Sequence, residues 1–153
     1  MKVVLELAFE SRIDDLLPHF RTYQAGCSQF SATSEEQTRD FLLDLLRNPS
    51  SGFVVLATID ALIVGFATGF ATISGVLAAR VIHLGDLYVD PAHRGSNIGG
   101  QLMEEVRAEA ARRGIELVRW LSVASNDKLN RWYQATGARV FDFKLFITDA
   151  KKG

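Results

Sequence analysis

The sequence has little of several residue types that define whole classes of protein. Cys27 is its only cysteine, so an intramolecular disulfide is impossible. Its three scattered histidines and one cysteine lack the spacing of a zinc site. No stretch approaches the roughly 20 apolar residues of a membrane helix, and the N-terminus turns acidic too early for a signal peptide. These absences predict a cytoplasmic protein that holds no metal and does not enter a membrane.

An excess of one charge is also missing. The chain has 17 basic and 18 acidic residues and a net charge of −1, which argues against nucleic acid as a partner. Its 153 residues, 48% of them hydrophobic, suffice for one core without a disulfide or a metal. We therefore expect residues 1–153 to form a single soluble domain.

Turn signals and hydrophobic periodicity divide the chain into helices and strands. Ser34 opens a Ser-Glu-Glu-Gln capping box, and Pro18 is expected to kink or divide the helix before it. The predicted elements are a strand over residues 3–9, helices starting at Ser11 and Ser34, strands over 52–59, 62–73 and 79–89, a helix over 97–113, a strand over 115–123, a helix over 126–136 and a strand over 138–148. The order β-α-α-β-β-β-α-β-α-β predicts an α/β fold with a mixed sheet and helices on its faces.

A small-residue loop follows the third long predicted strand and opens into a helix. Backbone N–H groups at a helix start have no intrahelical acceptor, and the helix dipole adds partial positive charge there. Glycines let a phosphate approach the main chain closely, and an arginine adds a fixed positive charge. The residues expected to bind a pyrophosphate are Arg94, Gly95, Ser96, Asn97, Ile98, Gly99 and Gly100. Ordinary packing of a helix on a sheet is the alternative interpretation of these glycines.

The same loop resembles a known signature. Residues 94–99, Arg-Gly-Ser-Asn-Ile-Gly, resemble the Arg/Gln-x-x-Gly-x-Gly/Ala motif of the GNAT superfamily of N-acetyltransferases, and the preceding Leu-x-Val-Asp-Pro is also similar to that family. Asn97 replaces the first motif glycine; because Asn tolerates left-handed backbone angles, we expect the loop to keep its shape.

The resemblance implies acetyl-CoA as cosubstrate and a twisted mixed sheet of six to seven strands flanked by about four helices. It also implies that the pantetheine arm pairs with the backbone of the strand at Leu87, Tyr88 and Val89. Gly85 is consistent with a bulge or a close approach just before these residues.

The predicted helix over residues 126–136 carries a polar stripe. At 100° per residue, Asn126, Asn130 and Tyr133 share one face, and we expect both amides to contact the cofactor. The GNAT superfamily has a similar helix with an Asn, an aromatic-Tyr pair and a Gly-Phe pair, which correspond here to Asn126, Trp132-Tyr133 and Gly137-Ala138.

Acetyl transfer to an amine requires loss of the amine's proton and protonation of the departing thiolate. Tyr133 is the candidate acid, as the resemblance also suggests. Asp86 is the candidate base, with substrate holding as an equal alternative and His83 or bulk water as other routes for the proton. The segment around Gly85 and Asp86 is similar to diamine-type members, which have carboxylates at both positions.

Tyr23 and Phe30, in the first helical region and the loop after it, are candidate contacts for an apolar amine through cation–π interactions, although core packing explains them equally well. The predicted function is acetylation of a primary amine of a small molecule. Acetylation of a protein or peptide is one alternative, and a non-catalytic acyl-CoA-binding sensor is another. The apolar residues 140–147 predict a homodimer.

Overall fold

The computed structural model describes residues 1–27 and 32–151, which form two compact units, Met1–Trp120 and Leu121–Gly153. Each unit is described by itself. The elements of the first unit are β1 (Val4–Leu7), α1 (Ile13–Ala25), α2 (Glu35–Arg47), β2 (Gly52–Ile59), β3 (Leu62–Ser74), β4 (Ala79–Val89), α3 (Ile98–Arg112) and β5 (Val118–Arg119), with 3-10 turns at Glu10–Arg12 and Pro91–His93. The second unit contains α4 (Asp127–Ala135).

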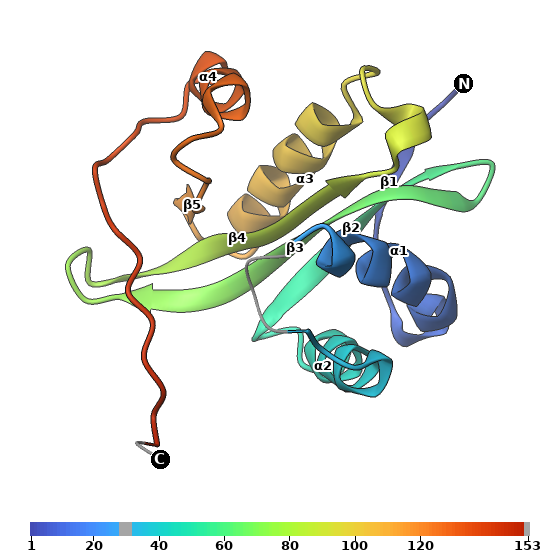
Figure 1. The fold of residues 1–153 in the computed structure, drawn as a ribbon, viewed down its shortest axis with the longest axis horizontal. Helices are drawn as coiled ribbons and strands as arrows, with labels where there is room; N and C mark the ends of the chain where they lie inside the picture. Colours follow the sequence, from blue (N-terminus) through green and yellow to red (C-terminus); the bar gives the residue numbers. More distant parts are fainter. Residues whose placement is uncertain (28–31, 152–153) are drawn as a thin grey trace. The chain divides into compact units, whose positions relative to one another are not determined.

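The sheet of the first unit has five strands in the order β1-β2-β3-β4-β5, counted over the part of the chain that the structure describes. The first three pairings are antiparallel and the β4–β5 pairing is parallel. Helices α1 and α2 lie on one face of this sheet and α3 lies on the other (Figure 1). The mixed α/β class and the four helices are therefore confirmed, while the expected six to seven strands are corrected to five.

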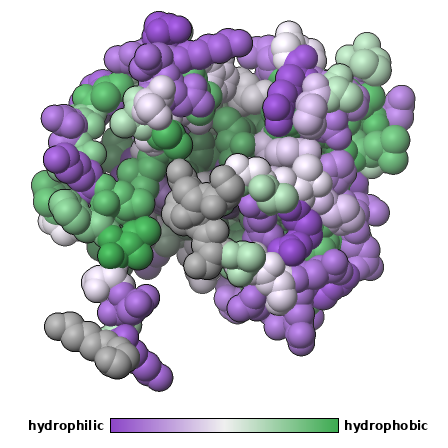
Figure 2. Space-filling view, in the orientation of Figure 1, coloured by the Kyte–Doolittle hydropathy of each residue, from purple (hydrophilic) through white to green (hydrophobic). Residues whose placement is uncertain are grey.

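Two predicted strands account for the difference. The strand expected over residues 115–123 is reduced to the two residues of β5, and residues 138–148 contain no strand. Phe143 and Phe146 of that segment are 83% and 87% exposed, and hydrophobic (green) side chains cover the surface along it (Figure 2). Its apolar composition suits a strand, but a strand also needs a neighbouring backbone, and the residues described here do not supply one.

Local sequence features account for the start of α2 and for the proline inside α1. The Ser34 side chain accepts from the Gln37 backbone N–H and the Gln37 side chain accepts from the Ser34 N–H, so the capping box is confirmed. Of the expected kink or division at Pro18, the division does not occur, because helix α1 runs from Ile13 to Ala25 with the proline inside it. The apolar side chains around the proline are buried, and this burial offsets the one helical hydrogen bond that the proline cannot make.

Large and small side chains alternate along the centre of β3, so the large ones lie on one face of the sheet and the small ones on the other. Phe66 stacks on Phe20 of α1 with ring centroids 4.8 Å apart, and Phe70 packs against Phe41 of α2 at 6.0 Å, so these large residues face α1 and α2. On the opposite face, a Cβ built on Gly65 would lie 3.3 Å from the Leu102 side chain of α3. The small residues therefore let α3 approach closely, and the large ones fill the core under α1 and α2.

Within the described ranges, no helix combines the length and the apolar character that crossing a membrane requires.

Candidate active site

The loop between β4 and α3 has a conformation fixed by short-range hydrogen bonds. The Asp90 side chain accepts from the Ala92 N–H at 2.9 Å, and the Asp90 carbonyl accepts from the His93 N–H at 2.8 Å. The chain then turns through two left-handed residues, Gly95 with φ of 85° and Asn97 with φ of 60° and ψ of 21°. Asparagine takes this conformation more readily than most residues, so the expectation that Asn97 preserves the glycine-type loop is confirmed.

This loop leaves a run of main-chain donors without acceptors. Within the described part of the chain, the backbone N–H groups of residues 95–100 make no hydrogen bond, and the first helical donor of α3 is the N–H of Gln101, which bonds to the Asn97 carbonyl at 3.1 Å. Residues 94–97 are exposed to solvent. Consecutive free donors at the positive end of a 15-residue helix suit an anion such as a diphosphate, so the donor set fits the phosphate end of CoA.

Two side chains shape the mouth of the loop. Arg94 donates through Nε to the Val89 carbonyl at 2.9 Å, which ties its exposed guanidinium to the end of β4. A Cβ built on Gly100 would lie 2.3 Å from Oδ1 of Asn97, so the Asn97 side chain lies against the first turn of α3. Asn97 makes no capping hydrogen bond of its own.

Gly85 forms a bulge in β4, as its position had suggested. Thr68 pairs with Asp86 and Gly69 pairs with Leu84, so Gly85 is the extra residue between two consecutive pairs. The parallel ladder to β5 includes Ile82 and His83 and does not extend past the bulge. From residue 85 to residue 89, β4 is paired with β3 on one side, and the described residues place no strand on its other side. That edge offers main-chain groups to a ligand.

Asp86 stands just after the bulge, hydrogen-bonded to Thr68 and close to Tyr23. Thr68, which is fully buried on β3, donates through Oγ1 to Asp86 Oδ2 at 2.5 Å, and the Tyr23 hydroxyl of α1 lies near the same carboxylate. Burial raises the pKa of Asp86 above its ordinary 3.8, while the bonds from Thr68 and Tyr23 and the nearby His83 act in the opposite direction. A carboxylate with a raised pKa is a better proton acceptor than an ordinary aspartate.

Tyr23 packs its ring within an aromatic cluster while its hydroxyl reaches Asp86. Its ring centroid lies 5.8 Å from that of Phe66 and 6.4 Å from that of Tyr88. Burial and then the Asp86 charge raise the pKa of Tyr23, so the phenol stays protonated and remains a donor. The structure therefore brings Tyr23 and Asp86, two residues predicted separately, into one cluster with Thr68.

The remaining residues that were predicted in this unit lie around the same strand. The Tyr88 side chain is 7% exposed and belongs to the core, so only its backbone can meet a ligand. Burial and the charge of Arg119 lower the pKa of His83, which keeps its imidazole neutral near pH 7. His93 has a buried Nδ1 without a hydrogen-bond partner, 3.8 Å from Asp90.

In the second unit, both predicted amides have local partners. Asn126 caps α4 by accepting from the Leu129 N–H at 3.1 Å. Asn130 accepts from the Ser122 hydroxyl at 2.6 Å and donates to the Val123 carbonyl at 3.0 Å. These bonds fix the loop that precedes α4, and contact with a cofactor stays a prediction for both side chains.

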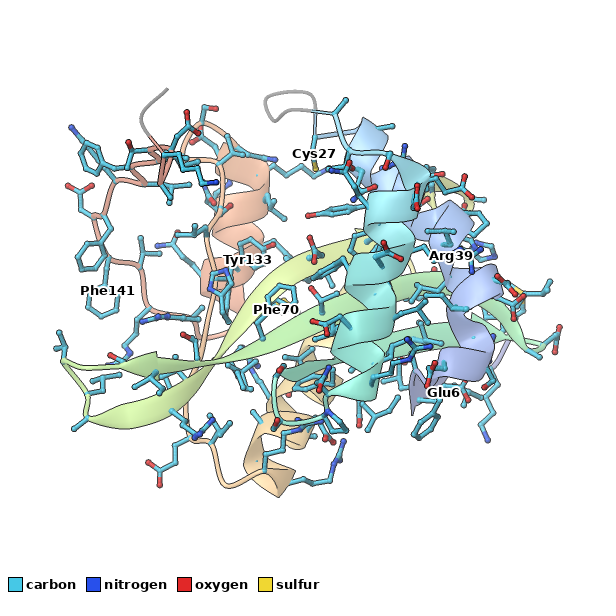
Figure 3. All side chains as sticks on the ribbon, turned by 90° about the horizontal axis from the view of Figure 1, so that it is seen from below. Glu6, Cys27, Arg39, Phe70, Tyr133 and Phe141 are labelled. Carbon is cyan, nitrogen blue, oxygen red and sulfur yellow. The ribbon has the colours of Figure 1, made fainter. Side chains whose placement is uncertain are left out.

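Tyr133 lies on α4 beside Trp132, with ring centroids 5.1 Å apart, and burial raises its pKa above the ordinary 10.0 (Figure 3). Phe30 lies outside the described residues. In the described part of the chain, no three His, Cys, Asp or Glu side chains come together as a metal site would need.

Thr68 and Phe70 are the site residues that the sequence analysis missed. Both lie on the face of β3 that α1 and α2 cover, and Figure 3 shows Phe70 on the sheet beside α2. The alternation Gly-Phe-Ala-Thr-Gly-Phe over residues 65–70 carried the signal, because it assigns Phe66, Thr68 and Phe70 to one face.

A family model described as the acetyltransferase (GNAT) family matches residues 14–138, and the chain belongs to this family. Acetyl-CoA is the acetyl donor of the family, and membership supports an acetyltransferase. A search of curated proteins finds no match.

Solved structures share the fold across the whole chain. The aminoglycoside N-acetyltransferase AAC(6')-Iy in complex with CoA is 14% identical, with a TM-score of 0.84 over 98% of this chain and 96% of that one. The aminoglycoside acetyltransferase meta-AAC0020 from an uncultured soil metagenomic sample, in complex with sisomicin, is 20% identical, with a TM-score of 0.77 over 98% and 97%. A ribosomal-protein-alanine N-acetyltransferase from Brucella melitensis biovar Abortus 2308 is 17% identical, with a TM-score of 0.74 over 97% and 99%.

Proposed function

We propose that this protein is an N-acetyltransferase that moves the acetyl group of acetyl-CoA directly onto a primary amine of a small molecule, with both substrates bound together. One arrangement carries the proposal: unpaired main-chain donors at residues 95–100 and the hydroxyl-held carboxylate of Asp86 flank the same stretch of β4. The first group suits a diphosphate and the second suits an ammonium group, so the two ends of the stretch match the two substrates.

Binding of the cosubstrate is assigned to the loop and the open edge of β4. The N–H groups of residues 95–100 would hold the pyrophosphate, with the Arg94 guanidinium adding charge at the loop mouth. The backbone of Leu87, Tyr88 and Val89 would hold the pantetheine arm, because this edge of β4 carries no β5 ladder. Acetyl-CoA supplies the thioester.

Asp86 is assigned the removal of the amine's proton. An alkylammonium group has a pKa near 10.4, so the amine must lose a proton before its lone pair can attack. The half-buried carboxylate attracts the ammonium form and accepts its proton, directly or through a water molecule. Thr68 holds the carboxylate in place without neutralising it, since its hydroxyl donates a hydrogen bond to Asp86, and the neutral Tyr23 phenol also favours the charged form.

Tyr133 is assigned the protonation of the thiolate that leaves, and Asn126 and Asn130 are assigned contacts with CoA. These roles rest on the resemblance of the helix over residues 126–136 to the family's motif and on the chemistry of a phenol that burial keeps protonated. The neighbours that bind CoA and sisomicin are consistent with a small-molecule acceptor, although their sequence identity supports only the fold.

The proposal is tested by combining a binding measurement with a turnover measurement. Titration calorimetry with CoA should give saturable binding, and a thiol reagent should detect CoA release when acetyl-CoA is mixed with a panel of primary amines. Asp86→Asn should lower turnover while leaving CoA affinity close to that of the wild type. Thr58→Val, which changes a buried strand threonine away from this cluster, serves as the control variant.

The outcomes separate the alternatives. CoA binding without release in the presence of every amine and peptide would contradict an enzyme and favour an acyl-CoA sensor. Release with peptides alone would favour a protein N-acetyltransferase. The cytoplasmic location and the homodimer stay predictions; size-exclusion chromatography with light scattering tests the second of them.

A further inference from the structure

The bulge in β4 places position 85 and Asp86 side by side on one face of the sheet. Thr68 and Phe70 share the face of β3 that α1 and α2 cover, and Asp86 pairs with Thr68. A Cβ built on Gly85 would lie 2.0 Å from Cε2 of Phe70 and therefore points to the same face. Any side chain at position 85 would be a direct neighbour of the Asp86 carboxylate.

The Phe70 ring fills that place. Besides the 2.0 Å approach of Cε2, its Cδ2 and Cζ atoms would lie 2.8 Å and 3.0 Å from the added Cβ, well inside van der Waals contact. The ring also packs against Phe41 of α2, with centroids 6.0 Å apart, and against the core cluster under α1 and α2. Gly85 does not have a positive φ, so its backbone would accept a side chain if the ring were absent.

The result is a site with one carboxylate beside aromatic rings. Asp86 is the acidic group beside Tyr23 and Thr68, and Phe70 is the partly buried ring that fills the neighbouring place at Gly85. A carboxylate binds one ammonium group, and aromatic rings bury apolar surface. A second ammonium group placed along these rings would lose its hydration without gaining an anionic partner.

We propose that Phe70, by occupying the space beside Gly85, limits the acceptor to amines with one cationic group and an apolar body, such as alkyl or arylalkyl monoamines, and excludes diamines. This rests on the proposed acetyltransferase function and specifies the acceptor class of the same site. Phe70 acts as a residue that determines specificity and does not take part in the proton transfer.

A matched pair of acceptors tests the proposal in the wild-type protein. Hexylamine and 1,6-diaminohexane have the same chain length and differ in one ammonium group. The value of kcat/KM, measured by CoA release, should favour hexylamine by at least about tenfold, because a hydrogen bond to a charged group typically contributes that much or more. Equal values, or a preference for the diamine, would overturn the proposal.

Two double variants then test the cause. Phe70→Ala/Gly85→Asp removes the ring and adds a second carboxylate, and Phe70→Ala/Gly85→Asn adds a side chain of the same size without the charge. The first should shift the ratio of kcat/KM toward the diamine by about tenfold or more relative to the second. Identical ratios in the two variants would show that position 85 does not face the acceptor and would overturn the proposal.

The wild-type comparison requires no variant, so it decides the question even if both double variants fail to fold. If no amine of any kind releases CoA, the acetyltransferase function itself fails, and the acceptor class fails with it. If amines are acetylated but the diamine reacts as well as hexylamine, only the selectivity assigned to Phe70 fails. The two failures are therefore distinguishable.

Discussion

Replacing Thr68 with valine would remove one hydroxyl group from the buried face of β3 while nearly preserving the volume of the side chain. Thr68 is fully buried, and its hydroxyl donates to Asp86 Oδ2 at 2.5 Å. A hydrogen bond to a charged group contributes about 1.5–3 kcal/mol. We therefore expect Thr68→Val to lower the free energy of unfolding by about 2 kcal/mol at neutral pH, a fall in Tm of about 4–8 °C for a chain of this size.

The loss should depend on pH in a direction that the structure fixes. The Thr68 hydroxyl lowers the pKa of Asp86, so it stabilises the charged carboxylate. Its removal raises that pKa further, and the lost stability is largest above the pKa of Asp86 in the folded protein and shrinks as pH falls through it. Urea denaturation at several pH values, and the pH profile of kcat/KM with its acid limb displaced to higher pH, would measure the two effects.

Thr58→Val is the matched control. Thr58 is also a buried strand threonine, 3% exposed, but its hydroxyl lies 3.5 Å from the Val4 carbonyl and no carboxylate is involved. Its substitution should give a smaller loss that does not vary with pH. If the stability losses of the two variants run parallel from acid to neutral pH, Thr68 does not support the charge on Asp86 and the reasoning is refuted.

Substitutions at three further positions probe other parts of the chain. Asn97→Gly should keep the affinity for CoA. Asn97→Val should weaken that affinity and destabilise the protein by about 1–2 kcal/mol, because a β-branched residue resists the left-handed conformation. Calorimetry would measure the affinity, and thermal melts would measure the stability. Burial opposes ionisation of Glu109, but its ion pairs with Arg113 and Arg112 lower its pKa. Glu109→Gln should therefore reduce the free energy of unfolding by about 1 kcal/mol above pH 4.5 and by less in acid, and thermal melts at several pH values would measure the difference. Tyr133→Phe should lower kcat and leave CoA affinity unchanged, and an unchanged kcat with acetyl transfer as the slow step would remove Tyr133 from the mechanism.

The features that the sequence predicted well depend on a few neighbouring residues. The hairpin at Asp60 and Ala61 has φ values of 49° and 67°, which match a tight turn between two strands. The capping box at Ser34 forms as its spacing requires. The left-handed Asn97 follows from its place in a glycine-type loop. Each of these depends on local backbone preferences, so no tertiary information was needed.

The cluster around Asp86 could not be predicted in the same way. Tyr23 comes from α1, Thr68 from β3 and Asp86 from β4, and their meeting depends on how α1 packs on the sheet and on the register between two strands. That register includes the bulge, which shifts the pairing by one residue. Sequence alone indicated that Gly85 was unusual, but it did not indicate which residue of β3 would face Asp86.

The predicted strand over residues 138–148 failed for a related reason. Alternation and apolar composition show that a segment is compatible with a strand. A strand forms only where a second backbone supplies hydrogen bonds. The parallel ladder of β5 is limited to two residue pairs, so it presents little edge on which to extend the sheet. Pattern alone therefore overestimated both the length of β5 and the number of strands.

The bulge at Gly85 also explains why one strand can serve both substrates in the proposed reaction. Directly opposed residues share a face of a sheet, so Leu84, opposite Gly69, faces α3, whereas Asp86, opposite Thr68, faces α1 and α2. A regular strand that contained all three residues would place residues 84 and 86 on the same face, so losing the bulge while keeping Gly85 would move either Leu84, 5% exposed, or Asp86 and all that follows it to the wrong side of the sheet. The packing on both sides of the sheet thus maintains the bulge. The bulge directs the Asp86 carboxylate toward Tyr23. It also marks the end of the β5 ladder, and beyond it the backbone edge of β4 is open to a cosubstrate.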